Sequence, residues 1–141
     1  MKKTHVIGLF VAIFALTNCS KDILKKYDKR IIGTWRIADV DRYGLGGNID
    51  NLPFIDGSIT FNEDGTLSYV NSSNSTFTGT WDIVKKTTDN GTVHSLIITA
   101  VNYNSIEVLS QYYDDMNFTG TDRFRATAVA QFHSYVTIFR R

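Results

Sequence analysis

Two residue types are nearly missing from this chain of 141 residues, which has one cysteine and one proline. With Cys19 alone, no disulfide can form within the chain, so a hydrophobic core has to stabilise the fold. With Pro53 alone, long stretches remain free to form hydrogen-bonded strands. The chain also lacks an excess of charge of one sign, because 15 Lys and Arg balance 14 Asp and Glu, and no run of like charges is longer than a pair. This balance argues against a nucleic-acid partner.

The N-terminal residues have the pattern of a targeting segment. Two lysines precede an apolar run at residues 6–16, which is too short for a spanning helix of about 20 residues. The run ends in Leu16-Thr17-Asn18-Cys19, which resembles a lipobox, although Asn18 replaces the usual small residue. An ordinary cleavage site would need small residues at positions −1 and −3, and no pair here fits well. We therefore expect a signal peptide at residues 1–18, acylation of Cys19 and a membrane anchor.

The remaining chain reads as a short helix followed by strands. Residues 19–30 form the lipidated end, a tether and a short helix, in which Ile23 and Tyr27 share one face. From Ile31 onward the apolar residues alternate with period two, as in half-buried strands. Turn sequences such as Asp-Gly and Asn-Gly separate the runs. We predict eight strands, at 31–40, 58–62, 66–71, 76–85, 92–101, 105–112, 121–130 and 132–140.

These strands predict an all-β domain at residues 31–141. Consecutive strands with tight turns favour an eight-stranded antiparallel up-and-down barrel, because closure removes exposed edges. A two-sheet sandwich is the rival arrangement. One connection, at residues 41–57, is long, is rich in glycine around Gly44–Gly47, and carries apolar side chains such as those of Leu45, Leu52, Phe54 and Ile55. We expect this loop to be a mobile lid whose Leu52, Phe54 and Ile55 face the barrel opening.

Three segments resemble the lipocalin-like domains of Bacteroidetes lipoproteins. They are Gly33-Thr34-Trp35, the strand-turn segment at residues 58–66, and the sequence Thr-Gly-Thr-Trp-Asp at residues 78–82. The resemblance implies a lipocalin-like barrel that holds a small apolar or amphipathic ligand. It also implies that Trp35 packs at the barrel base against an arginine, for which Arg125 and Arg140 are both candidates. Residues 20–22, Ser-Lys-Asp, resemble the family's signal for export to the outer face of the outer membrane.

Residues that could carry catalysis or bind a metal are scattered. His94 and His133 fall on different predicted strands and lack the spacing of metal ligands. No Gly-x-Ser-x-Gly elbow is present for a serine hydrolase. Asp114 and Asp115 lie in a predicted loop with Asn117, which is better explained as a solvated turn than as a calcium site. We therefore expect a protein without enzymatic activity, cofactor or metal.

Aromatic residues make up 13% of the chain and either fill the barrel or line a pocket. Alternation places Phe124 on one face with Ala126, Ala128 and Ala130. If that face points inward, the small side chains leave volume, and an eight-stranded barrel can then hold one small ligand. The predicted ligand site consists of Phe54, Phe61, Tyr69, Trp81, Phe124, Ala126 and Ala128.

Two functions are consistent with these features. The first is a monomeric lipoprotein, anchored in the bacterial outer membrane and facing the cell surface or the periplasm, whose barrel binds a small hydrophobic or amphipathic molecule. The second is an envelope module with a filled barrel, whose loops recognise a protein or a glycan. An apolar cavity under the 41–57 loop would favour the first function. A solid core with an exposed apolar patch would favour the second.

Overall fold

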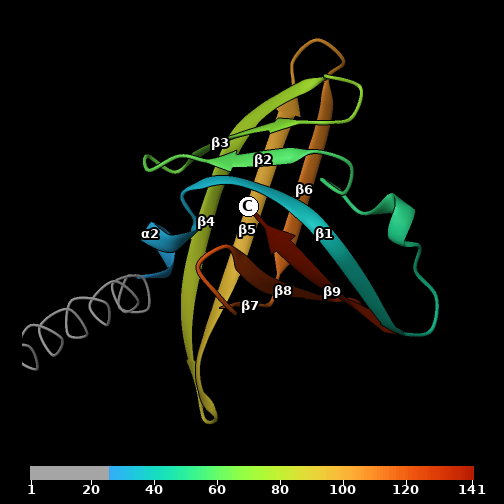
Figure 1. Cartoon of the computed structure of the whole chain (residues 1–141). Helices are drawn as coiled ribbons and strands as arrows, with labels where there is room; N and C mark the ends of the chain where they lie inside the picture. The colour runs from blue at the N-terminus through green and yellow to red at the C-terminus, as the bar shows by residue number, and fades with distance from the viewer. Residues whose placement is uncertain (1–25) are drawn as a thin grey trace, which may run out of the picture.

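The computed structural model describes residues 26–141 of the chain (Figure 1). The predicted signal peptide, Cys19 and the first residues of the tether lie outside these residues. Within the described part, no helix is long and apolar enough to cross a membrane. The domain has one short helix, a single turn of 3-10 helix and nine strands. They are α2 Tyr27–Ile31, β1 Gly33–Gly44, η1 Ile49–Asn51, β2 Ser58–Phe61, β3 Thr66–Val70, β4 Thr76–Thr88, β5 Gly91–Asn102, β6 Glu107–Tyr113, β7 Asp115–Phe118, β8 Arg123–Val129 and β9 His133–Arg140.

The nine strands form one antiparallel sheet in the order β6-β5-β4-β3-β2-β1-β9-β8-β7. The all-β class and the short helix are therefore confirmed. The sheet curls so that β7 approaches β5 (Figure 1). The edge strands β6 and β7 are consecutive in the chain and are separated only by Asp114. The backbone N–H of Asp114 donates a hydrogen bond to the carbonyl of Thr127 in β8 (2.7 Å), and the carbonyl of Asp114 accepts one from the hydroxyl of Ser95 in β5 (2.9 Å). The edges do not pair with each other, so the hydrogen-bonded sheet is not closed.

Two segments form a different element from the one that the sequence predicts. Ile31 was expected to begin a strand, but it ends α2 with its side chain fully buried, and β1 begins at Gly33. Residues 115–118 were expected to lie in a loop, but they form β7. Met116 explains this strand, because it is buried opposite Ala126 of β8 and contributes an apolar side chain to the core. Phe118, on the same face, also packs against the core, with 5.5 Å between its ring centroid and that of Phe124. The polar neighbours Asp115 and Asn117 obscure this short alternation in the sequence.

The core at the α2 end is built around Trp35. Its ring is fully buried, and its Nε1 donates a hydrogen bond to the carbonyl of Ile31 (2.5 Å). The guanidinium of Arg141 lies 4.2 Å from the ring centroid, a distance at which a cation is attracted to the indole face. The arginine against Trp35 is therefore Arg141, one position beyond the candidate Arg140. Ile31 and Arg141 together hold the helix and the chain end against the tryptophan.

Candidate functional site

The loop between β1 and β2 closes one end of the curled sheet. It begins later than predicted, because β1 continues to Gly44. Gly44 has a φ of +92°, and a Cβ there would lie 2.3 Å from the carbonyl oxygen of Phe132. Gly47 has a φ of +76°, and a Cβ there would lie 2.2 Å from the Tyr135 hydroxyl. These glycines allow close approach to β9, which differs from the mobility that the sequence suggested.

Phe54 anchors this loop in the core. Its side chain is 2% exposed and meets the ring of Tyr69 edge-on, with 5.1 Å between the centroids. The predicted lid residue Phe54 therefore belongs to the packed interior, while Leu52 and Ile55 are half-buried. Phe54 also has a φ of +67°, which is unfavourable for a bulky side chain. Packing of the ring offsets this backbone cost.

A hydrogen-bonded carboxylate holds the same loop to β3. Asp56 accepts hydrogen bonds from the hydroxyl of Tyr69 and from the hydroxyl of Ser72, the latter at 2.7 Å. These two donors lower the pKa of the Asp56 carboxyl, because they stabilise its charged form. Burial, followed by the neighbouring Asp56, raises the pKa of Tyr69. The loop is thus fixed by both apolar and polar contacts.

Six of the seven residues predicted to bind a ligand lie together in the hydrophobic core. Each is at most 8% exposed, and their rings contact other core rings. Phe124 stacks on Phe139 at 4.3 Å between centroids, and Met116 lies opposite Ala126. Neighbouring side chains therefore occupy space beside the small residues. The six are Phe54, Phe61, Tyr69, Phe124, Ala126 and Ala128.

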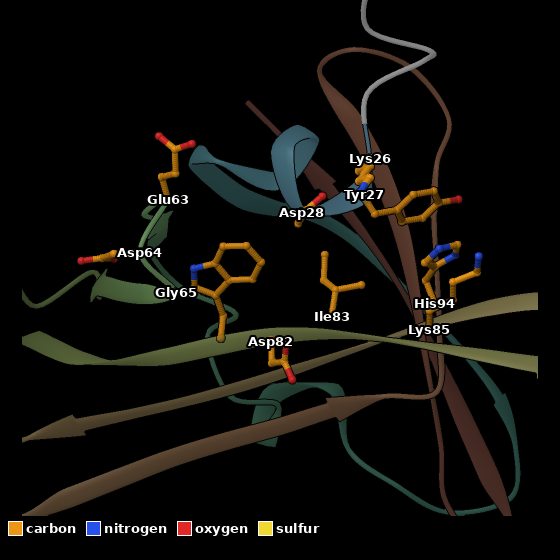
Figure 2. A pocket seen from close by; sticks show the side chains of 11 residues that line it. Lys26, Tyr27, Asp28, Glu63, Asp64, Gly65, Asp82, Ile83, Lys85 and His94 are labelled. Atoms are coloured by element: carbon orange, nitrogen blue, oxygen red, sulfur yellow. The ribbon is translucent and has the colours of Figure 1, made fainter.

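The seventh predicted residue, Trp81, packs against Phe61 of this core with 5.7 Å between ring centroids, and it lines an open groove of about 740 Å³ at the end of the domain opposite the β1–β2 loop. This volume lies in the range of small-molecule sites, about 300–1,000 Å³. The groove separates α2 from the inner face of β4, and the turn between β2 and β3 forms its side wall (Figure 2). The lining residues are Lys26, Tyr27, Asp28, Glu63, Asp64, Gly65, Trp81, Asp82, Ile83, Lys85 and His94.

The floor of the groove is apolar because of the alternation along β4. Trp81 and Ile83 point to the inner face, opposite Ile98 and Leu96 of β5. Figure 2 shows Ile83 directed from β4 toward α2, and Asp82 directed to the other side of the strand. Both floor residues are half-buried, so their apolar atoms are accessible from the groove. The floor therefore continues the hydrophobic core to the surface.

A stacked pair of rings forms one end of the groove. Tyr27 of α2 lies parallel to His94 of β5, with 3.8 Å between centroids, and its hydroxyl donates a hydrogen bond to Asn117 of β7 (3.1 Å). Tyr27 thus connects β5 to β7, two strands that do not pair with each other in the sheet. Burial and then the nearby charge of Lys85 lower the pKa of His94, which favours its neutral form. Lys85 is directly opposite His94 in the strand ladder.

Acidic residues lie at the other end of the groove, on the turn between β2 and β3 (Figure 2). Glu63 forms a salt bridge with Lys29 of α2, so its charge is balanced. Asp64 accepts hydrogen bonds from the backbone and the hydroxyl of Thr66, at 2.9 and 2.6 Å, and these bonds lower its carboxyl pKa. Both acids are therefore engaged in holding the turn and the helix.

The lining of the groove has the features of a site that binds a small molecule. No group of three or more His, Cys, Asp or Glu side chains is placed to hold a metal ion among residues 26–141. Its histidine stacks on a tyrosine instead of meeting a nucleophile. An apolar floor flanked by polar ends can bind an amphipathic molecule, with its apolar part on Ile83 and Trp81.

Sequence reasoning placed only Trp81 of the groove residues in a ligand site. Alternation along β4 could have added Ile83 and Lys85, which share the face of Trp81. The position of Tyr27 depends on how α2 crosses the end of the sheet. The spacing of residues along the sequence does not predict this crossing.

The function of the groove has to be inferred from its own residues, because comparisons with known proteins do not identify one. The resemblance to lipocalin-like domains rests on three short segments and their order in the chain. No family model, curated protein or solved structure matches this chain.

Proposed function

We propose that this chain is a non-catalytic, lipid-anchored envelope protein that binds a small amphipathic molecule in the groove between α2 and β4. The observation that carries the proposal is the accessible apolar floor of Trp81 and Ile83 between polar ends. A Leu- or Ile-sized apolar surface removed from water contributes about 1.5–3 kcal/mol, so this floor can hold an alkyl group. The packed core is a poorer candidate, because its aromatic rings already contact one another.

The two lysines at the end of the groove with the stacked rings favour a ligand with an anionic head group at that end. Lys26 and Lys85 lie near the stacked rings of Tyr27 and His94. Neither lysine forms a salt bridge with another residue in the range 26–141. At the opposite end, Lys29 already balances Glu63. An anionic head beside Lys85 would therefore gain a charge-assisted hydrogen bond, while the alkyl part covers Ile83.

The lipocalin-like barrel and the outer-membrane location remain parts of this proposal. The curled sheet and the contact between Arg141 and Trp35 support a barrel related to that family. The lipobox ending at Cys19 supports the anchor. Stable attachment to a membrane requires more than one acyl chain, as bacterial lipoproteins carry.

Calorimetric titration with dodecanoate and with dodecylamine tests the groove. We expect dodecanoate to bind more tightly, because its carboxylate meets Lys85. Lys85→Glu should weaken dodecanoate binding about tenfold, equivalent to about 1.4 kcal/mol. Lys86→Glu is the matched control, because Lys86 is directed to the outer face and bonds to the Tyr112 hydroxyl. Equal effects of the two variants would remove the head-group assignment.

The apolar floor needs a separate variant. Ile83→Gln should weaken both probes, since it replaces the surface that contacts the alkyl chain. Val84→Gln changes the adjacent residue on the other face of β4 and should leave binding unchanged. If neither probe binds the wild-type protein, the alternative of a protein- or glycan-recognition module becomes the better explanation. The exposed turn residues Tyr103, Ile106 and Phe132, at 79, 85 and 69% exposure, favour that alternative.

A further inference from the structure

Strand β6 is one edge of the hydrogen-bonded sheet, and β8 approaches it without pairing. It pairs with β5 on one side, and it is the first strand in the sheet order. The chain leaves β6 at Asp114 and joins β8 through β7, so the other side of β6 has no strand partner among residues 26–141. Glu107 is its only charged residue, and it contains neither lysine nor proline. Natural proteins usually protect an exposed edge strand with lysine or proline. Because β6 has neither, its edge is suited to pairing with another strand.

The outer face of β6 has exposed apolar residues at two positions. Val108 is 60% exposed and Tyr112 is 40% exposed, and both point away from the core. The residues between them alternate, with half-buried Leu109 and Gln111 on the inner face. Ser110 lies on the outer face, midway between Val108 and Tyr112. The strand is therefore symmetric in its exposed apolar positions about Ser110.

This symmetry is what an isologous antiparallel pair requires. Opposite residues of two antiparallel strands lie on the same face of the sheet, so a two-fold axis at Ser110 places Val108 opposite the partner's Tyr112. The same register places Leu109 opposite the partner's Gln111 on the inner face. Pairs between β-branched and aromatic residues stabilise antiparallel strands. The arrangement uses one surface patch twice, as a two-fold dimer does.

We propose that two copies of this chain pair through β6, antiparallel and about a two-fold axis at Ser110. The contact would extend the sheet across the dimer and would cover Val108 of both copies. This differs from the monomer that the sequence predicts, in which residues 105–112 form an interior strand of a closed barrel. The groove lies on the inner face of β4 and the paired edge lies on β6, so dimerisation leaves the proposed ligand site open.

Thiol cross-linking tests the position of the axis. The full chain carrying Cys19→Ala has no other thiol, and Ser110→Cys then places one thiol beside the two-fold axis. Opposite Cα atoms in an antiparallel pair lie about 4.5–5.5 Å apart, which a disulfide can span. We expect mild oxidation to give a covalent dimer. Ser73→Cys, in the exposed turn before β4, should give no covalent dimer, because Ser73 lies away from the β6 edge. Equal cross-linking of both variants, or none at Ser110→Cys, would overturn the register.

Sedimentation velocity tests the pairing itself. The Cys19→Ala chain should show a concentration-dependent dimer, and adding Val108→Lys should convert it to monomer, because it places charges at the interface. Val70→Lys is the control, since Val70 is a partly exposed valine on the interior strand β3, and this variant should still dimerise. Circular dichroism confirms that each variant is folded. A wild-type monomer at all concentrations, or dimerisation unaffected by Val108→Lys, would refute the proposal.

Discussion

Phe54 allows the packing of the loop end to be tested in depth. Its side chain is 2% exposed and meets Tyr69 with 5.1 Å between ring centroids. Truncation of a buried aromatic residue to alanine typically costs about 3–5 kcal/mol. The whole domain has about 5–15 kcal/mol of stability. We therefore expect Phe54→Ala to remove a large part of the free energy of unfolding, an effect that a mobile lid residue would not have.

The backbone at Phe54 adds a second, independent expectation. Its φ of +67° lies in the left-handed region, which costs a residue with a Cβ roughly 1–2 kcal/mol. Phe54→Gly removes the same ring as Phe54→Ala but also relieves this backbone cost. The glycine variant should therefore be more stable than the alanine variant by about 1 kcal/mol, although it has the smaller side chain.

Urea denaturation followed by tryptophan fluorescence measures both differences. Leu45→Ala is the control in the same loop, because Leu45 is 82% exposed. Its effect should stay within about 0.5 kcal/mol. If Phe54→Ala is destabilised by less than about 1 kcal/mol, the ring does not contribute to the core as its burial implies. Dodecanoate binding should be unchanged in folded Phe54→Ala, since the groove is at the other end.

Four further predictions concern other parts of the chain. Trp35→Phe should destabilise the domain in urea, because it loses the hydrogen bond to Ile31 and part of the stack with Arg141. Gly44→Ala should lower the melting temperature, because its Cβ would meet the Phe132 carbonyl. The depressed pKa of Asp56 gives stability that is present above the unfolded pKa of about 3.9 and is lost as pH falls through the lower folded value; acid titration of Tyr69→Phe should therefore show a smaller loss. Cys19→Ala should abolish incorporation of labelled fatty acid, and labelling of this variant would contradict the lipobox.

Local patterns were enough to predict most of the fold. Alternation in segments such as residues 76–85 and 132–140 predicted strands, because a half-buried strand requires period two. Asp-Gly and Asn-Gly positioned the turns, and Gly65 and Gly91 do adopt positive φ. The fully buried Trp35 also agrees with the packing expected at the base. These features depend on neighbours in sequence, which a sequence shows directly.

Features that depend on distant contacts were not predictable in the same way. β7 exists because its two inward residues, Met116 and Phe118, face Ala126 and Phe124 across the ladder, and a four-residue strand has too few alternations to stand out. Arg141 was missed because stacking on Trp35 depends on where the chain ends in space. The 41–57 loop looked like a lid from its composition, but the packing of Phe54 made it part of the core.

The sequence by itself determined the strand-forming face of each segment and the turn positions. The tertiary structure decided which inward residues are enclosed and which remain accessible. Trp81 and Tyr69 have the same local pattern, an aromatic residue on the inner face between two outward neighbours, yet Tyr69 is buried against Phe54 and Trp81 lines the groove. The physical reason is that burial depends on what crosses the end of the sheet. There α2 leaves a gap above Ile83, whereas at the other end Phe54 fills the core.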